Sequence, residues 1–260
     1  MNVFLLTDLE GIPGVTTIDQ MERGTPKNLD AREKLCAWIN KTASYCRQYG
    51  ADRIYYLDGH GGGGNVDESR IDPTLIKCLI PDWERLLANG LIDCQIELGA
   101  HARAGTIGGF LDHTVSSKEW FRYTLNGEEQ SELSIHAILC GAYGVPIVAC
   151  IGDEAACEQA KEYIPEIVTG TVKKASCRNL CEDDPNAEEI VEKTVKKALA
   201  SYREIPAYRY SLPLTVELTY YRTDMCEKAM GKAKCKFLRK DARTLQKQIF
   251  KVESYSDLKF

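Results

Sequence analysis

Two carboxylates, separated by one residue, end the apolar run at the beginning of this chain. Residues 1–10 have the apolar character of a buried strand, and Asp8 and Glu10 lie at its end, just before Gly11. Successive side chains of a strand point to opposite faces, so these two share one face. Two negative charges this close repel each other unless a positive charge lies between them. The pattern therefore predicts a metal-binding site.

Histidines follow the next two expected strands at the corresponding point. His60 and His101 each come shortly after an apolar run that is typical of a strand. In an open parallel sheet, ligands bind beyond the carboxyl ends of the strands. His113 lies in the loop after His101, and Glu132 opens the next expected helix, where a carboxylate also suits the helix dipole. We expect these side chains to converge with the first two carboxylates.

The resulting set of two imidazoles and three carboxylates suits zinc, manganese or cobalt better than calcium or an iron–sulfur cluster. A catalytic zinc takes three protein ligands and keeps one position open, so five ligands exceed the need of one ion. Two metal ions that share one carboxylate fit the number better. Asp8, on a rigid strand at the centre of the set, is the expected bridge.

Strands and helices alternate over residues 1–165, which is typical of an α/β fold with a mainly parallel sheet flanked by helices. The remainder predicts a smaller C-terminal α+β part, so we expect a catalytic domain at 1–165 and a smaller part at 166–260, packed as one unit or as two. Expected strands lie at 2–7, 53–57, 94–98, 145–150 and 214–220, with a strand or turn at 120–125, and expected helices begin near 28 or 30 and lie near 74–80, 82–88, 132–143, 154–162 and 187–202.

Composition narrows the possible functions. The chain has 260 residues and a formal net charge of −5, which argues against nucleic acid as a partner, since phosphate binding needs basic surface. The basic stretch at 232–236 is accordingly expected to be a solvated surface segment. No run reaches the ~18 apolar residues of a membrane span, and the first strand leaves no room for a signal peptide. These features predict a cytoplasmic protein without membrane contact.

The chain has 11 cysteines, and they are scattered along it. Without a secretion signal, a disulfide framework is not expected. Most of them lie in apolar patterns, where cysteine acts as a small hydrophobic residue. Poor ligand spacing disfavours a structural zinc site on the four cysteines that come closest to one, which are Cys177, Cys181, Cys226 and Cys235.

Three further features have structural interpretations. His136 falls on the apolar side of the helix at 132–143 and is expected to be a packed, hydrogen-bonded histidine. Asp58 is expected to orient the glycine-rich loop that follows it rather than to bind metal. The four glycines at 61–64 lack the Lys-Ser/Thr of a P-loop, so a phosphate cradle is disfavoured.

A series of short motifs covers nearly the whole chain. They lie at 8–14, 58–61, 101–106, 111–114, 126–128, 141–146 and 152–154, and continue at 215–218 and 222–225. In this order they resemble the motifs of the zinc D-aminopeptidases encoded with bacterial dipeptide-transport systems. Departures from the family pattern occur at 61–66, in the loop 101–113 and at 231–240, which concern the substrate side more than the metal ligands.

The resemblance implies a site for two zinc ions, for which Mn²⁺ or Co²⁺ could substitute. It also implies an α/β domain with a smaller second part, a homo-oligomer in the form of a ring-like decamer, and the release of N-terminal D-amino acids such as D-alanine from short peptides. His113 matches the family's catalytic histidine, and the family's metal-binding positions match Asp8, Glu10, His60, His101 and Glu132.

The expected chemistry is amide hydrolysis by metal-activated water. The sequence leaves open whether His113 transfers a proton, stabilises an oxyanion or attacks as a nucleophile. A phosphoesterase or another amidase could use the same ligand types, although phosphate needs basic residues and Arg103 is the only close one in the motifs. A non-catalytic metal-binding subunit of an assembly is the third candidate, but a scaffold has no need of His113.

Overall fold

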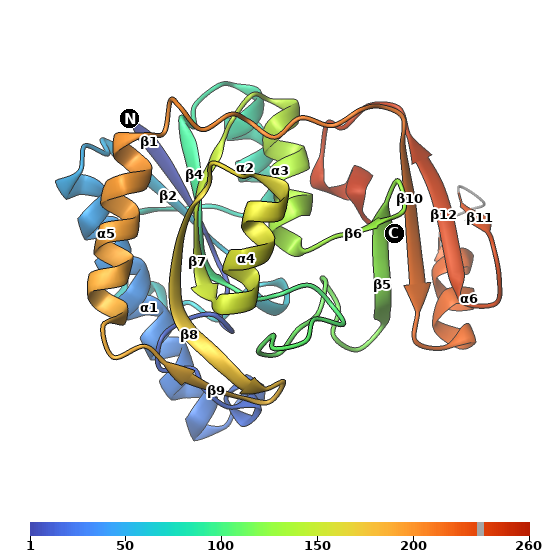
Figure 1. Cartoon of the computed structure of the whole chain (residues 1–260), viewed down its shortest axis with the longest axis horizontal. Coiled ribbons are helices and arrows are strands. Elements are labelled where there is room, and N and C mark those ends of the chain that lie inside the picture. Colours follow the sequence, from blue (N-terminus) through green and yellow to red (C-terminus); the bar gives the residue numbers. More distant parts are fainter. Residues whose placement is uncertain (233–236) are drawn as a thin grey trace.

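Two sheets organise the chain in the computed structural model, which describes residues 1–232 and 237–260 (Figure 1). Within these residues the larger sheet has seven strands in the order β3-β2-β1-β4-β7-β8-β9, and the smaller has five in the order β11-β12-β10-β5-β6. Neighbours in the larger sheet are parallel except for β8 and β9. All pairings in the smaller sheet are antiparallel. The expected α/β fold with a mainly parallel sheet is confirmed.

The elements have the following bounds. The larger sheet contains β1 (Asn2–Thr7), β2 (Arg53–Asp58), β3 (Ile76–Lys77), β4 (Cys94–Ala100), β7 (Ile147–Asp153), β8 (Val168–Cys177) and β9 (Leu180–Asp183). The smaller sheet contains β5 (Trp120–Leu125), β6 (Glu128–Glu129), β10 (Leu214–Tyr220), β11 (Leu238–Arg239) and β12 (Thr244–Ile249). The α-helices are α1 (Pro26–Gln48), α2 (Ile80–Ala88), α3 (Glu132–Ala142), α4 (Glu154–Tyr163), α5 (Ala187–Ala200) and α6 (Thr223–Lys232), and the short 3₁₀ helices are η1 (Ile18–Met21), η2 (His60–Gly62), η3 (Glu68–Arg70) and η4 (Tyr255–Leu258).

Helices cover both faces of the larger sheet (Figure 1). α1 and α5 pack together on one face, and α3 and α4 pack together on the other. The central strand β1 is therefore buried on both sides, and its residues Phe4 and Leu5 have no exposed surface. This burial explains why the sequence of β1 is a continuous apolar run rather than an alternating one.

The strand order reverses beside β1. This strand lies between β2 and β4 and is parallel to both. From β1 the chain adds β2 and β3 on one side, and it then crosses to add β4, β7 and β8 on the other. The crevice at the carboxyl ends of strands beside such a reversal is the usual ligand site of an open α/β sheet. The carboxyl ends of β1, β2 and β4 are therefore the place where function is expected.

Most of the expected elements are confirmed, with ends that differ by a few residues. They are the strands at 2–7, 53–57, 94–98, 145–150 and 214–220 and the helices near 82–88, 132–143, 154–162 and 187–202. The first helix begins at Pro26, slightly before the expected start, because the Thr25 side chain caps it by accepting a hydrogen bond from the Asn28 N–H. The segment 120–125 is a strand, β5, and pairs with β10.

The prediction of a helix near 74–80 is wrong. Ile76 and Lys77 instead form the edge strand β3, which pairs with β2. Leu79 has an extended backbone, and Pro81 lies in the first turn of α2, so the helix begins only at Ile80. Proline favours the first turn of a helix, where its missing N–H costs no hydrogen bond.

Residues 1–165 and residues 166–260 each contribute strands to both sheets. β8 and β9 follow residue 165 but belong to the larger sheet, whereas β5 and β6 precede it and belong to the smaller one. The division at 165/166 therefore stays a prediction. The expectation of a solvated basic segment at 232–236 falls on residues 233–236, which lie outside the described residues.

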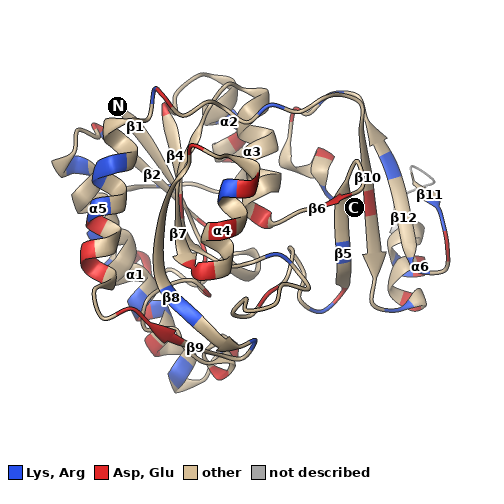
Figure 2. Cartoon of the chain, viewed as in Figure 1, with Lys and Arg blue, Asp and Glu red and all other residues tan. Residues whose placement is uncertain are grey.

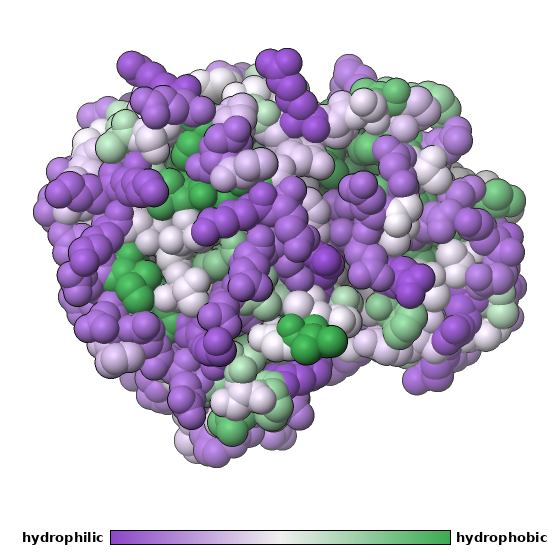
Figure 3. All heavy atoms as spheres, in the orientation of Figure 1, coloured by the Kyte–Doolittle hydropathy of each residue, from purple (hydrophilic) through white to green (hydrophobic). Residues whose placement is uncertain are grey.

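Charges of both signs are mixed on the surface. Figure 2 shows basic and acidic residues interspersed along α4 and α5, and Figure 3 shows a largely hydrophilic face with isolated hydrophobic groups. In residues 1–232 and 237–260, no helix has both the length and the apolar character that are needed to cross a bilayer.

The ends of β1 and β4 approach each other closely at Gly99. The Asp8 N–H donates to the Leu98 carbonyl at 2.8 Å, and the Gly11 N–H donates to the Gly99 carbonyl at 2.8 Å. Gly99 has a φ of +84°, and a Cβ at this position would lie 2.1 Å from the carbonyl oxygen of Asp8. Glycine is required here both by the backbone conformation and by the close contact. The position of Asp8 therefore depends on a residue of the neighbouring strand.

We expect Gly99→Ala to lower the free energy of unfolding by more than about 2 kcal/mol, since it adds a steric overlap to an unfavourable φ. Gly144→Ala is the matched control, because Gly144 has a φ of +74° but nothing within 4 Å of an added Cβ. The control should cost about 1 kcal/mol. Denaturant unfolding measures both values, and equal losses would show that the contact with Asp8 is unimportant.

Candidate metal centre

The candidate ligands come from different elements of the larger sheet. Asp8 and Glu10 follow β1, His60 begins η2 directly after β2, and His101 follows β4. Glu132 lies in the first turn of α3, whose N-terminus is capped by Ser131. The structure places all five of these side chains, together with His113, at the carboxyl edge of the sheet.

Asp8 belongs to two groups of possible metal ligands. Asp8, Glu10 and His60 form one group, in which one ligand atom of each residue lies within 4.8 Å of the others. Asp8, His101 and Glu132 form a second group by the same measure. Two metal ions that share one carboxylate would need this arrangement. The geometry thus fits the expectation that Asp8 is the bridge.

The hydrogen bonds of His101 leave one ring nitrogen free for a metal. Its Nδ1 lies 3.0 Å from the carbonyl oxygen of Ala102, to which it donates a hydrogen bond, so Nε2 is the nitrogen whose lone pair a metal could take in place of a proton. This Nε2 is buried, and it lies 3.2 Å from Asp8 Oδ2 and 3.3 Å from Glu132 Oε1 without a hydrogen bond to either. A buried nitrogen that faces two carboxylates in this way is what a metal ligand would show.

The carboxylates and the imidazoles stabilise each other's charged forms. Burial by itself would raise the pKa of Asp8, but the close contact with His101 and the hydrogen bond with His60 hold it well below its usual range. Burial opposes charge on His60 too, yet the negative charge of Glu10 and the contact with Asp8 raise its pKa to about 11. The pKa of Glu132 is lowered to about 2 against burial, because of its contact with His101. Without metal, protons on the imidazoles therefore take the place of the positive charge that the carboxylates require.

The residues present fit a metal centre. Imidazole nitrogens and carboxylate oxygens are common ligand atoms of zinc. The buried Nε2 of His101 has no hydrogen-bond partner, and a bound ion would satisfy it. Cysteines take no part in the ligand groups found among the described residues. Of the four cysteines considered for structural zinc, Cys181 and Cys226 are buried, and Cys235 lies outside the described residues.

His113 lies beside this cluster on a strained loop. Its ring stacks on that of His101 with centroids 4.0 Å apart, and its Nδ1 contacts the Leu111 carbonyl at 2.8 Å. The Nε2 lies 3.6 Å from Glu132 Oε1. Leu111 and Val115, on either side of it, have φ values of 51° and 61°, which are unfavourable for these side chains. The loop is therefore held in a costly conformation that presents one nitrogen of His113 to the cluster.

Contacts with distant residues hold that loop in place. The buried side chain of Asp153 caps α4 through the Ala156 N–H and also accepts a hydrogen bond from the Phe110 N–H at 2.8 Å. The Val115 N–H donates to Glu132 Oε1 at 2.8 Å. Asp153 therefore holds the loop in place, and the loop in turn holds the carboxylate of Glu132.

The structural interpretations of Asp58 and His136 are confirmed. Asp58 accepts hydrogen bonds from the backbone and the side chain of Asn65, and the Asn65 amide also donates to the His60 carbonyl. Asp58 therefore orders the glycine-rich loop. His136 is buried, with its Nδ1 3.2 Å from Glu97 Oε1 and its Nε2 3.4 Å from the Tyr255 hydroxyl.

Sequence reasoning missed Lys173, which supports the segment that carries Glu10. The side chain of this lysine has no exposed surface, and burial lowers its pKa. Its ammonium donates to the carbonyl oxygens of Glu10 at 3.1 Å, of Ile12 at 2.5 Å and of Val15, and it lies 3.5 Å from Asp183. One cation therefore gathers three carbonyls of the turn that follows β1. No local signal marks this lysine, because the carbonyls that it binds are 158 to 163 residues away.

We expect Lys173→Met to lower the free energy of unfolding by about 3 kcal/mol or more, because it leaves buried carbonyls without a donor. It should also weaken metal binding in the group that contains Glu10. Lys174→Met is the matched control, since Lys174 is exposed and pairs with Glu154, and it should change stability by less than about 1 kcal/mol. Denaturant unfolding and metal titration measure the two effects, and unchanged metal affinity in folded Lys173→Met would contradict the second.

The comparisons with known proteins agree with this α/β fold. A family model described as D-aminopeptidase matches residues 1–257, so the chain belongs to the D-aminopeptidase family, as its motifs predict. A D-aminopeptidase from Bacillus subtilis (strain 168) is 28% identical over 188 residues, which span 69% of this chain and 66% of that protein. The solved structure of the Zn-dependent D-aminopeptidase DppA from Bacillus subtilis, a self-compartmentalizing protease, has a TM-score of 0.89 at 19% identity and covers 99% of this chain and 95% of its own.

Proposed function

We propose that this protein is a zinc-dependent D-aminopeptidase that removes N-terminal D-amino acids, such as D-alanine, from short peptides. The observation that carries the proposal is the pair of ligand groups that share Asp8, in a chain that belongs to the D-aminopeptidase family. The proposed ligands are Asp8, Glu10, His60, His101 and Glu132, and the proposed catalytic residue is His113.

Zinc, when bound, lowers the pKa of water toward neutral pH and polarises a carbonyl, which is the chemistry that amide hydrolysis needs. The chain's own contribution is to hold the reacting groups. Asp8 fixes the centre of the cluster, and His113 presents Nε2 beside Glu132. With Nδ1 donating to the Leu111 carbonyl, this Nε2 can accept a proton and return it to the leaving amine.

A cavity of about 420 Å³ lies beside the cluster, which is a size that fits short peptides. Asp8, His60, His113 and Glu132 contribute to one end of it, so a substrate in the cavity would reach the cluster. The similar structure is of a self-compartmentalizing protease, and this supports a homo-oligomer, which we propose to be a ring-like decamer with peptides as substrates.

The alternatives have less support. Arg103, the basic residue that phosphate binding would need, pairs instead with Glu162 at 2.9 Å and approaches Glu129 at 3.9 Å. A cytoplasmic location remains part of the proposal. It is supported by the cysteines of the described residues, which are all free, as is usual in reducing compartments.

The zinc-loaded protein should release p-nitroaniline from D-alanyl p-nitroanilide and leave the L-isomer intact. A chelator should abolish the release, and added Zn²⁺ should restore it, because the water is activated only by bound metal. p-Nitrophenyl phosphate serves as the control for phosphoesterase chemistry. If protein with about two zinc ions per chain hydrolyses neither isomer, the aminopeptidase proposal fails, and release from the phosphate ester would favour the phosphoesterase.

His113→Ala should lower turnover of the D-isomer by ~100-fold or more, which is typical for the loss of a general acid–base group. The zinc content, measured by atomic absorption, should stay the same, since His113 is not among the proposed ligands. Lys174→Met is the control, because Lys174 is exposed, pairs with Glu154 and does not line the cavity. Full turnover in His113→Ala would remove this residue from the mechanism.

A further inference from the structure

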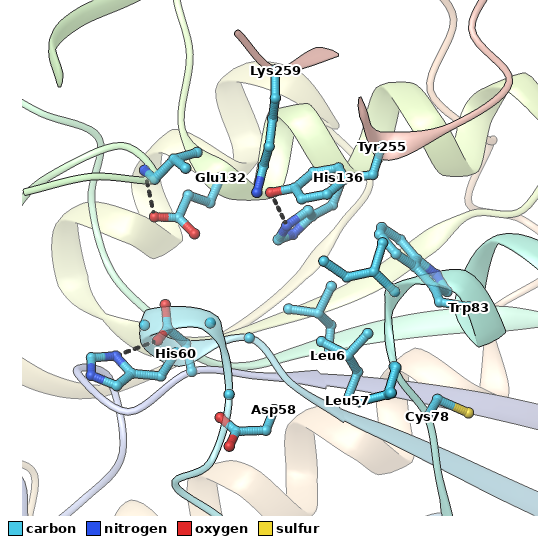
Figure 4. Close-up of a pocket in the computed structure, with 18 of the residues that line it drawn as sticks. Leu6, Leu57, Asp58, His60, Cys78, Trp83, Glu132, His136, Tyr255 and Lys259 are labelled. Atoms are coloured by element: carbon cyan, nitrogen blue, oxygen red, sulfur yellow. Dashed lines mark hydrogen bonds and ion pairs between the residues drawn. The ribbon is translucent and has the colours of Figure 1, made fainter. Parts of the chain in front are cut away.

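The cavity beside the metal ligands has a second wall of different chemistry. Apolar residues such as Leu6, Leu57 and Trp83 line its interior. Opposite His60 the wall is formed by Tyr255 and Lys259, which come from the last segment of the chain (Figure 4). This segment contains η4 and follows the smaller sheet in sequence. The cavity therefore lies between the metal ligands and a cationic side chain.

Lys259 points its ammonium into this cavity, toward the side of Glu132 (Figure 4). Within residues 1–232 and 237–260 its ammonium has no ion pair and no side-chain hydrogen bond, whereas lysines such as Lys27, Lys41 and Lys240 are paired with carboxylates. It lies over the ring of Tyr255, whose centroid is 4.1 Å from the nitrogen. A partly buried cation without an anionic partner can bind an anion that enters the cavity.

The platform under Lys259 is rigid. The Tyr255 hydroxyl lies 3.4 Å from His136 Nε2, and His136 Nδ1 lies 3.2 Å from Glu97. The ring of Trp83 meets the rings of both His136 and Tyr255 edge-on, at 5.6 and 5.9 Å. The backbone of Lys259 is also held, since its N–H donates to the Ser256 carbonyl at 3.2 Å. The lysine is therefore positioned before any ligand arrives.

Lys259 interacts electrostatically with Glu132. Burial lowers the pKa of Lys259, and the negative charge of Glu132 opposes this effect. The two side chains therefore influence each other across the cavity. The ammonium of Lys259 is thus a positive charge on the wall of the cavity to which Glu132 also contributes.

We propose that Lys259 binds the C-terminal carboxylate of a dipeptide whose amide bond lies at the metal ligands, an inference that rests on the proposed aminopeptidase function. In a dipeptide, three covalent bonds separate the carboxylate carbon from the carbonyl carbon that is cleaved, so the two lie within about 4 Å of each other. The carboxylate must then enter the same cavity as the scissile bond. Lys259 thereby selects dipeptides that have a free carboxyl group.

The test compares D-alanyl-D-alanine with D-alanyl-D-alaninamide, which lacks the negative charge. In zinc-loaded Lys259→Met, KM for the dipeptide should rise by about tenfold or more, because a hydrogen bond to a charged group is lost, while kcat changes little. KM for the amide should change by less than about twofold. Lys259→Arg should restore much of the preference, since it keeps the charge. Lys251→Met, at an exposed lysine that pairs with Glu253, is the control for the loss of a surface charge.

Binding provides a readout that does not depend on turnover. Calorimetry on slowly reacting His113→Ala should give tighter binding of D-alanyl-D-alanine than of its amide, and this difference should disappear when Lys259→Met is added. Equal effects of Lys259→Met on both ligands, or no effect on either, would overturn the role of Lys259 while leaving the aminopeptidase activity established. If the wild-type protein hydrolyses neither ligand, the proposed function fails, and the role of Lys259 fails with it.

Discussion

The repulsion among three carboxylates at the edge of the larger sheet is the constraint on which this structure depends. Asp8 lies close to both Glu10 and Glu132, and each of the three contacts an imidazole. Attraction between carboxylates and imidazoles lowers the pKa values of Asp8 and Glu132 and raises the pKa of His60. Protons or metal ions can supply the positive charge, so metal binding at this edge must displace protons.

The backbone has to hold these charges together against their repulsion, and it does so at some cost. Gly99 permits the close approach of two strands at Asp8, and Lys173 gathers the carbonyls that follow Glu10. The loop around His113 shows the cost most directly, because Leu111 and Val115 adopt φ values that such side chains avoid. Strain of this kind persists only where the surrounding contacts enforce it, and here Asp153 and Glu132 provide those contacts.

The sequence was informative where local pattern and sheet geometry act together. Residues directly after parallel strands must meet at one edge, so Asp8, His60 and His101 could be placed together without a structure. The same reasoning failed for 74–80, where a two-residue edge strand is too short to have a pattern of its own. It also could not find Lys173 or Lys259. Their roles arise from packing between segments that are far apart in the chain, which no spacing in the sequence reveals.

The smaller sheet and the segment that follows it also bear on function. Tyr255 and Lys259 close the cavity from the side opposite the strand ends, and the polar chain from Tyr255 through His136 to Glu97 ties this segment to β4 of the larger sheet. The groups that would activate a substrate and the group that would select it therefore come from different parts of the chain. The last segment is tied to the larger sheet through buried groups, so the position of Lys259 depends on the packing of both sheets.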